Sequence, residues 1–299
     1  QSDISRLAST PYLAPAVVKR AGTILHATKQ GLETEKHADY LMALINNTLK
    51  AQGHLPIKIQ TKAKSSELYD TAFINSDSPL SEIAAALSPA EPASFCLYGP
   101  PGTGKTAWAY WLAAQLKLPV IEKKASQLFG RYVGESEQNI AAAFEQARRD
   151  KAVLLIDEID SFLTAREDCR QSWEISCVNE MLSQMEQFTG IFITTTNRFD
   201  VLDAAALRRF DLKVHFNFLC DYQAVALLNL YCDSLRLGAP SASAITELAR
   251  LPSLTPGDFF SVSRQHKFRP LTSASAFVTA LKAECRLKKR QETAIGFLH

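Results

Sequence analysis

A run of small residues with one lysine, between positions 99 and 106, carries the clearest sign of chemistry in this sequence. It reads Gly99-Pro100-Pro101-Gly102-Thr103-Gly104-Lys105-Thr106 and fits the phosphate-loop pattern G-x-x-x-x-G-K-[ST]. Glycines let the backbone curl so that successive N–H groups point at one anion. We expect Lys105 to bridge the β- and γ-phosphates of a nucleotide and the Thr106 hydroxyl to ligate Mg²⁺. Ala107 continues the site into a helix whose N-terminus adds partial positive charge.

Two adjacent carboxylates follow an apolar run farther along the chain. Val153-Leu154-Leu155-Ile156 reads as a buried strand that ends in Asp157 and Glu158. We expect Asp157 to hold the Mg²⁺ shell and Glu158 to polarise a water that attacks the γ-phosphorus. Asn197 ends the next strand and is placed to orient that water, although an Asn there is also a common turn residue. Acidic residues after a strand can also reflect the preference of helix N-termini for negative charge, but the phosphate loop favours the catalytic interpretation.

The same glycines allow a second interpretation. Gly102, Gly104 and Ala107 satisfy a loose dinucleotide-binding pattern, and Glu122 stands at the distance of the ribose-binding acid. Such a match is weak by itself. Because hydride transfer has no use for the acidic pair after the apolar run, nucleotide hydrolysis remains the stronger prediction.

The elements that must position these residues follow from the apolar periodicity. Short apolar runs alternate with helical patterns after Ser94, which predicts a doubly wound α/β domain with a parallel sheet. Helical faces alone continue after Cys220, the last of them carrying Phe277, Leu281 and Leu287. The predicted domains are an N-terminal helical region with a linker (residues 1–65), the nucleotide-binding domain (66–219) and a helical lid (220–299).

Composition excludes several classes of protein. The 299 residues carry 33 basic and 31 acidic side chains, a net charge of +2 that is too even to predict binding to nucleic acid or to a membrane surface. No apolar run approaches the roughly 20 residues that span a bilayer. The cysteines form no C-x-x-C pair, which predicts reduced thiols in a cytoplasmic protein without zinc. The chain begins at Gln1 without a methionine, and we expect it to be a piece of a longer protein.

Taken in order, these motifs resemble an AAA ATPase of the AAA+ superfamily, of a bacterial type with unassigned substrate. The resemblance covers about Ser94 to Lys267 and includes the segment that begins Leu202-Asp203 and ends Leu207-Arg208-Arg209-Phe210-Asp211. It implies a P-loop αβα domain with a lid, ATP/ADP and Mg²⁺ as ligands, and a homo-oligomeric, hexameric ring. It also implies that Asn197 is the first sensor and that Gly257 lets the lid backbone approach the nucleotide.

The arginines of the family segment are implied to be fingers that reach the ATP of a neighbouring subunit. The usual form separates the two arginines by Pro-Gly, whereas Arg208 and Arg209 are adjacent here. Both cannot occupy the usual positions without a changed loop. We therefore expect a finger in this pair without ranking its members; the alternative is a surface ion-pairing site.

The stretch from Gly130 to Glu137 resembles the family's first pore loop, with Tyr132, Val133 and Gly134 at its tip. Aromatic rings on glycine-flanked tips can grip an extended polypeptide through apolar contact; the alternative is that Tyr132 packs on the sheet. Residues 164–176 are a weaker candidate for a second pore loop. The predicted function is a ring ATPase that remodels, unfolds or disassembles a protein. The alternatives are an assembly switch with slow hydrolysis and a nucleic-acid motor.

Overall fold

The computed structural model describes residues 13–27, 37–51, 70–130, 132, 134–163 and 172–295. The chain divides into two compact units, Gln1–Lys62 and Ala63–His299. The first unit holds helices α2 (Pro15–Ala27) and α3 (His37–Ala51). They pack through apolar side chains, and the buried members of this cluster are Leu13, Ala21, Ile45 and Leu49.

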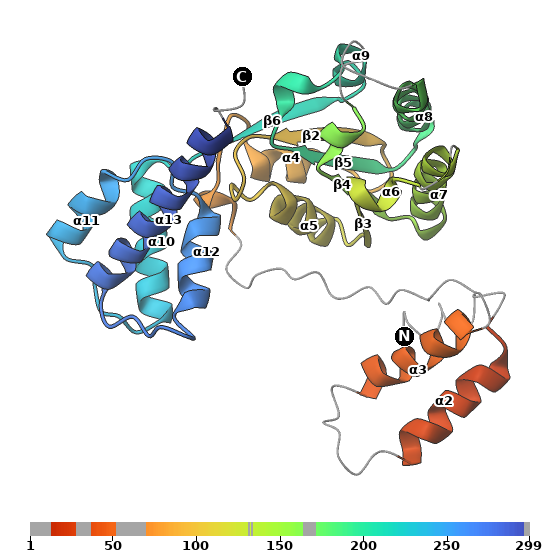
Figure 1. The fold of residues 1–299 in the computed structure, drawn as a ribbon, viewed down its shortest axis with the longest axis horizontal. Coiled ribbons are helices and arrows are strands. Elements are labelled where there is room, and N and C mark those ends of the chain that lie inside the picture. Colours follow the sequence, from red (N-terminus) through yellow and green to blue (C-terminus); the bar gives the residue numbers. More distant parts are fainter. Residues whose placement is uncertain are drawn as a thin grey trace. The chain divides into compact units, whose positions relative to one another are not determined.

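A mainly parallel sheet forms the centre of the second unit (Figure 1). Its strands are β1 (Asn75–Ser76), β2 (Ala93–Tyr98), β3 (Val120–Lys124), β4 (Val153–Asp157), β5 (Ile191–Thr196) and β6 (Leu212–Asn217). They lie in the order β1-β6-β2-β5-β4-β3, and β1 alone among these pairs antiparallel, with β6. The prediction of a parallel sheet is therefore confirmed except at β1, whose two polar residues give no apolar signal.

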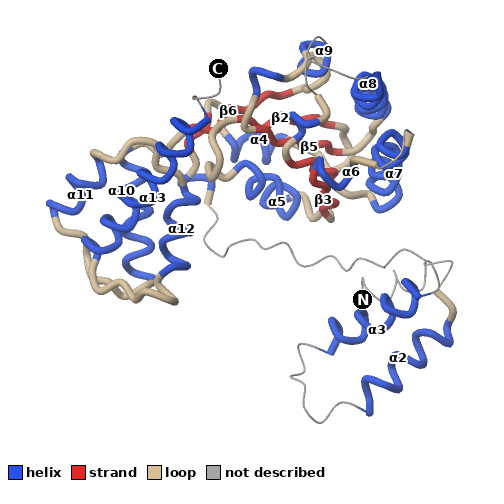
Figure 2. Tube along the Cα trace, viewed as in Figure 1, coloured by secondary structure: helices blue, strands red, loops and turns tan. Residues whose placement is uncertain are grey.

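Helices cover both faces of this sheet (Figure 2). One core contains α4 and α5, and the other contains α7 and α8. The helices are α4 (Leu80–Ala86), α5 (Lys105–Gln115), α6 (Ala125–Leu128), α7 (Glu135–Asp150), α8 (Ser172–Gln187) and α9 (Ala204–Leu207), with single 3-10 turns η3 (Thr71–Phe73), η4 (Ile159–Ser161) and η5 (Phe199–Val201).

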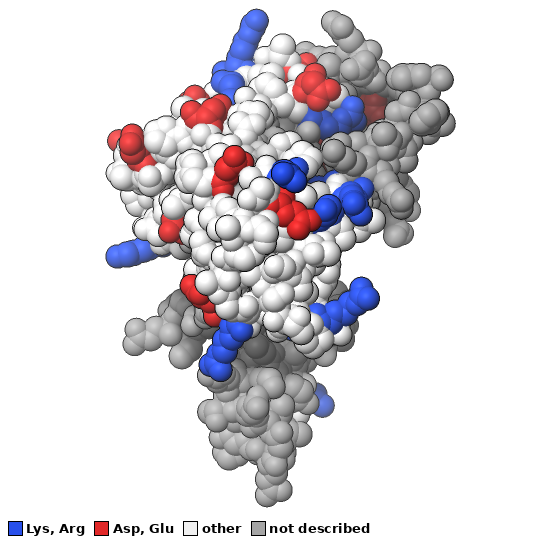
Figure 3. Space-filling model, turned by 90° about the vertical axis from the view of Figure 1, so that its left-hand side faces the viewer, with Lys and Arg blue, Asp and Glu red and all other residues white. Residues whose placement is uncertain are grey.

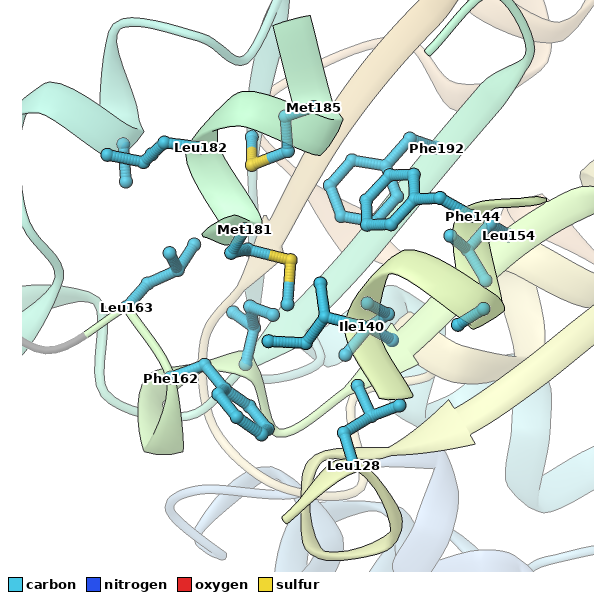
Figure 4. Close-up of a cluster of buried hydrophobic side chains, with 14 of the residues drawn as sticks. Leu128, Ile140, Phe144, Leu154, Phe162, Leu163, Met181, Leu182, Met185 and Phe192 are labelled. Carbon is cyan, nitrogen blue, oxygen red and sulfur yellow. The ribbon is translucent and has the colours of Figure 1, made fainter. Parts of the chain in front are cut away.

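Strand β4 shows why its sequence is continuously apolar. Val153 and Leu155 belong to the core under α5, while Leu154 and Ile156 belong to the core under α7 and α8. Figure 4 shows the second core, where Phe144 of α7 lies beside Phe192 of β5 with ring centroids 5.2 Å apart. A strand buried on both faces delivers the residues at its carboxyl end to one edge of the sheet.

The lid consists of α10 (Asp221–Ser234), α11 (Ala242–Ala249), α12 (Pro256–Gln265) and α13 (Ala274–Ile295). Phe277 and Leu281 are buried in its core as predicted, but the expectation for Leu287 is wrong because this side chain is 55% exposed. Buried Gln223 of α10 donates from Nε2 to the carbonyls of Ala72 (3.1 Å) and Ile74 (3.0 Å). The lid is thereby tied to the segment that precedes β1.

Candidate functional site

The phosphate loop connects β2 to α5 and has the backbone that its glycines allow. Gly99, Gly102 and Gly104 have φ angles of 134°, 80° and 100°, a region that residues with a side chain rarely adopt. A Cβ atom at Gly99 would lie 2.0 Å from the carbonyl oxygen of Phe216. The loop therefore needs glycine both for its dihedral angles and for its close approach to β6.

Lys105 begins α5, and its side chain is folded into the loop. Its Nζ donates to the carbonyls of Gly99 (2.7 Å) and Pro100 (2.8 Å) and to Oδ1 of Asn197 (2.8 Å). Burial lowers the pKa of Lys105 from its ordinary 10.5 to about 8, against the opposing influence of Asp157. The structure thus brings together the lysine and the sensor asparagine that the sequence predicted, and an anion would supply the counter-charge that this buried ammonium favours.

Asp157 lies at the end of β4 beside the first turn of α5. Its Oδ1 accepts hydrogen bonds from the hydroxyls of Thr106 (3.2 Å) and Thr195. Carboxylate and hydroxyl oxygens are the ligands that Mg²⁺ prefers, so Thr106 and Asp157 fit the predicted metal site. Sequence reasoning gave Thr195 no role. The signal that could have found Thr195 is the register of β5 against β4. Thr194 lies opposite Ile156, which brings the next residue of each strand, Thr195 and Asp157, to the same level.

Glu158 is exposed at the same edge of the sheet. Its φ of 60° places it in the left-handed region, which is uncommon for a residue with a long side chain. Its backbone N–H donates to the Thr195 hydroxyl at 3.4 Å. Residues in such sparsely populated conformations cluster at functional sites, which agrees with the role that the sequence predicts for Glu158.

The lid reaches the phosphate loop through Gly257 at the start of α12. Its N–H donates to the carbonyl of Gly102 at 2.9 Å. A Cβ atom at Gly257 would lie 3.0 Å from both Cα and O of Gly102. Glycine is thus needed here for a close backbone contact with the loop that should hold the phosphates.

The adjacent arginines have different surroundings. Arg209 forms an ion pair with Glu186 of α8 (NH2 to Oε1, 2.6 Å) and donates to the carbonyl of Ala205. Ser94 pins the loop by donating from its hydroxyl to the Arg209 carbonyl at 3.0 Å. Arg208 is exposed, and its side chain has no hydrogen-bond or ion-pair partner within the part of the chain that the structure describes. The changed loop therefore holds one arginine and leaves the other facing solvent.

Tyr132 projects into solvent with 75% of its surface exposed, so the alternative that it packs on the sheet is wrong. Its backbone N–H donates to Oε2 of Glu135, and Gly134 follows with a φ of 89°. Val133, the other predicted tip residue, lies outside the described residues, as do positions 164–171 of the second candidate loop. Phe129 at the base of the tip stacks on Phe162 with centroids 4.3 Å apart.

Two alternatives lose support from the structure: dinucleotide binding at the glycine loop, and nucleic-acid binding by the basic last helix. Glu122 lies on β3, which β5 and β4 separate from β2, and it accepts a hydrogen bond from the Tyr110 hydroxyl. It therefore cannot serve a dinucleotide bound at the loop after β2. Lys282 and Lys288, part of the basic last helix, pair with Glu247 and Asp258. On the face in Figure 3, which looks onto the lid, the coloured side chains of both signs are interspersed.

Comparisons with known proteins find relatives of the region that contains this site. Residues 95–218 match the family described as "ATPase family associated with various cellular activities (AAA)". The chain is 36% identical over 155 residues to proteasome-activating nucleotidase 1 of Haloferax volcanii, covering 48% of this chain and 38% of that protein. It is 40% identical over 126 residues to the uncharacterized AAA family ATPase y4kL of Sinorhizobium fredii, covering 41% of this chain and 38% of that protein.

A third relative is the ATP-dependent zinc metalloprotease FtsH 2 of a Thermoanaerobacter species, 37% identical over 131 residues, with 42% of this chain and 26% of that protein covered. The chain thus spans less than half the length of these relatives. A solved structure of the FIGL-1 AAA domain with ADP superimposes with a TM-score of 0.51 over 64% of this chain and 70% of that one, at 23% identity, which shows a shared fold. Among the described helices, none combines the length and apolarity needed to cross a membrane.

Proposed function

We propose that this chain hydrolyses Mg-ATP in a homo-oligomeric, hexameric ring and remodels a protein substrate. The match of residues 95–218 to the AAA ATPase family supports the proposal. The observation that carries the proposal is the meeting of four predicted residues at one edge of the sheet. Lys105 contacts Asn197, and Thr106 contacts Asp157. We place the protein in the cytoplasm, where the described cysteines would stay reduced, as they are here.

Each residue of this edge has a task in the proposed reaction. The loop from Gly99 to Thr106 binds the phosphates through backbone N–H groups and the Lys105 ammonium. Thr106 and Asp157 would hold Mg²⁺, which neutralises charge on the phosphate oxygens when it is bound. Glu158 accepts a proton from the attacking water, and Asn197 orients that water.

We propose Arg208 as the residue that acts on a neighbouring subunit. A finger must be free to enter another site, and Arg208 is exposed whereas Arg209 is held by Glu186. An arginine in trans stabilises the charge of the transition state and makes hydrolysis depend on the neighbour. Head-to-tail contacts of this kind close into a ring when the rotation between subunits closes.

The exposed Tyr132 supports action on a polypeptide. Its ring is 75% exposed on a segment that Gly134 follows with a φ of 89°, so it is accessible to another molecule. The proposed substrate is an extended protein segment gripped by these rings, with Val133 and Gly134 completing the tip. The names of two relatives, a proteasome-activating nucleotidase and an ATP-dependent zinc metalloprotease, refer to proteolysis, which acts on proteins.

The proposal is tested by combining one variant with size measurement. Glu158→Gln should bind ATP and hydrolyse it about 10²- to 10⁴-fold more slowly than the wild-type chain, because a general base contributes a factor of that size. Light scattering should show that this variant forms a ring with ATP and smaller species without nucleotide. Near-normal turnover would reject Glu158 as the base, and a monomer at saturating ATP would reject the ring.

A further inference from the structure

An ion pair inside the lid has its acidic partner buried beside the phosphate loop. Nζ of Lys288, on α13, lies 2.7 Å from Oδ2 of Asp258 at the start of α12. The Asp258 side chain is only 5% exposed and that of Lys288 is 28% exposed. This pair is therefore far less accessible to water than an ordinary surface salt bridge.

Asp258 fixes the first turn of α12. Its Oδ2 accepts hydrogen bonds from the backbone N–H (2.8 Å) and the hydroxyl (2.9 Å) of Thr255, which caps the helix. Lys288 donates to this carboxylate and also to the Thr255 hydroxyl at 3.1 Å. A buried carboxylate needs a compensating charge, and Lys288 supplies it.

The same turn of helix is seated on the phosphate loop. Gly257, between Thr255 and Asp258, donates its N–H to the carbonyl of Gly102 at 2.9 Å. A Cβ atom at Gly102 would lie 2.9 Å from the Thr255 hydroxyl oxygen. A continuous series of contacts therefore runs from Lys288 through Asp258 and the α12 cap to the glycines of the loop.

We propose that Lys288 is a positioning residue for the nucleotide: it neutralises buried Asp258 and so holds the first turn of α12, with the Gly257 N–H, against the phosphate loop. The inference rests on the proposed binding of ATP at Gly99–Thr106. Lys288 acts from the last helix of the lid and does not touch the nucleotide itself. It thereby couples the last helix of the lid to the geometry of the loop.

The lid offers a matched control. Lys282 is on the same helix α13 and pairs with Glu247 of α11 at 2.6 Å, with side-chain exposures of 39% and 41%. This pair joins two lid helices and contacts no residue of the phosphate loop or of the α12 cap. Removing it tests what the loss of a lysine from α13 does to the lid alone.

The experiment measures nucleotide affinity and thermal stability on the full chain. Fluorescent ADP is titrated into the wild type, Lys288→Met, Lys288→Arg and Lys282→Met, and the melting temperature is recorded without nucleotide. We expect Lys288→Met to weaken ADP binding about 10-fold, a coupling of ordinary size. Lys282→Met should stay within about 2-fold of the wild type, and Lys288→Arg should recover most of the affinity because it keeps the charge.

A double variant guards against loss of folding. In Asp258→Asn with Lys288→Met the buried charge is gone, while the amide oxygen still accepts from Thr255, so affinity should exceed that of Lys288→Met alone. Equal weakening by Lys288→Met and Lys282→Met would overturn the positioning role, as would wild-type affinity in Lys288→Met or no gain in the double variant. If the wild type binds no ADP while folded, the proposed function itself fails, which is a different result from any of these.

Discussion

Two groups of functional residues in this domain differ in their surroundings. One group lies at the carboxyl ends of the strands, here called the inner edge of the sheet, and the other lies on segments that face outward. At the inner edge, Lys105 contacts Asn197 and Asp157 contacts Thr106. On the outside, Arg208 is exposed and Tyr132 has 75% of its surface in water. The residues of the first group contact one another, whereas the side chains of the second group project into solvent.

This difference follows from the cost of burying polar groups. Buried donors must be paired within the chain, and Lys105 is the buried member of this group, so its ammonium holds Asn197 in place. Half-buried Asp157 and Thr106 pair with each other. Exposed residues carry no such requirement and are available to another molecule. In the proposed reaction, this comparison separates the residues that one chain would supply to its own ATP from those that it would supply to a neighbour or a substrate.

The strongest test of this separation is to remove each arginine in turn. Arg208→Ala should lower kcat about 10³-fold or more, because a finger in trans contributes a factor of that order. Arg209→Ala should lower it less than about 10-fold, since Arg209 is engaged with Glu186. Steady-state ATP hydrolysis at saturating ATP measures both.

Mixing variants shows whether Arg208 acts on a neighbour. Subunits with Lys105→Ala lack a working phosphate loop but keep Arg208, and subunits with Arg208→Ala keep the loop. Blends of the two should hydrolyse ATP faster than either alone. Absence of rescue at every ratio, or a larger loss in Arg209→Ala than in Arg208→Ala, would contradict the assignment.

Local patterns in the sequence predicted which residues meet at the inner edge. Gly99–Thr106 is one contiguous run, and the two acids directly follow Ile156. The chemistry of each segment depends on backbone geometry that its own residues determine. Thr195 was missed because its contact with Asp157 depends on the register of β5 against β4. No local pattern contains that information.

The outward segments were less predictable for the same reason. Arg209 is distinguished from Arg208 by Glu186, which lies 23 residues earlier on another helix. The Lys288–Asp258 pair joins positions 30 residues apart. Apolar periodicity also placed Leu287 in the lid core, whereas Leu287 lies off the face of α13 that buries Leu281 and Cys285. Pairings of side chains across elements are set by packing, which the sequence of one element does not reveal.

The buried lysine of the inner edge should make nucleotide binding sensitive to pH. Burial lowers the pKa of Lys105 to about 8, and bound phosphate favours the charged form. ADP affinity should therefore be steady below pH 8 and fall by up to about 10-fold per pH unit above it. Lys105→Arg, whose guanidinium keeps its charge, should show no such fall in titrations from pH 7 to 9.5.

The stability of the nucleotide-free chain changes in the opposite sense. Unfolded Lys105 keeps its ordinary pKa of 10.5, so the unfolded state binds more protons between pH 8 and 10.5. The contribution of Lys105 to folding stability therefore rises with pH through this window.

Affinity that stays constant up to pH 9.5 would show that Lys105 is not the group that meets the phosphates.

Removing the exposed ring should affect substrates and leave the chain intact. Tyr132→Ala should change unfolding free energy by no more than about 0.5 kcal/mol, since the ring is mostly in water. Basal ATP hydrolysis should stay within about 2-fold, but acceleration by an unfolded polypeptide such as denatured casein should be lost. Undiminished acceleration would contradict the proposed grip of Tyr132 on the polypeptide, and absence of acceleration in the wild type as well would favour the assembly switch.

The smallest expected effect concerns the anchor that distinguishes the two arginines. Glu186→Gln removes the ion pair between Arg209 and Glu186, whose side chains are 30% and 56% exposed, respectively. Solvent screening limits the loss of folding stability to about 1 kcal/mol, and the difference should shrink in high salt. Urea unfolding at two salt concentrations measures it. ATP hydrolysis should survive this change, because Arg208 does not depend on Glu186. A fall as deep as that of Arg208→Ala would mean that the held arginine is the one that completes the neighbouring site.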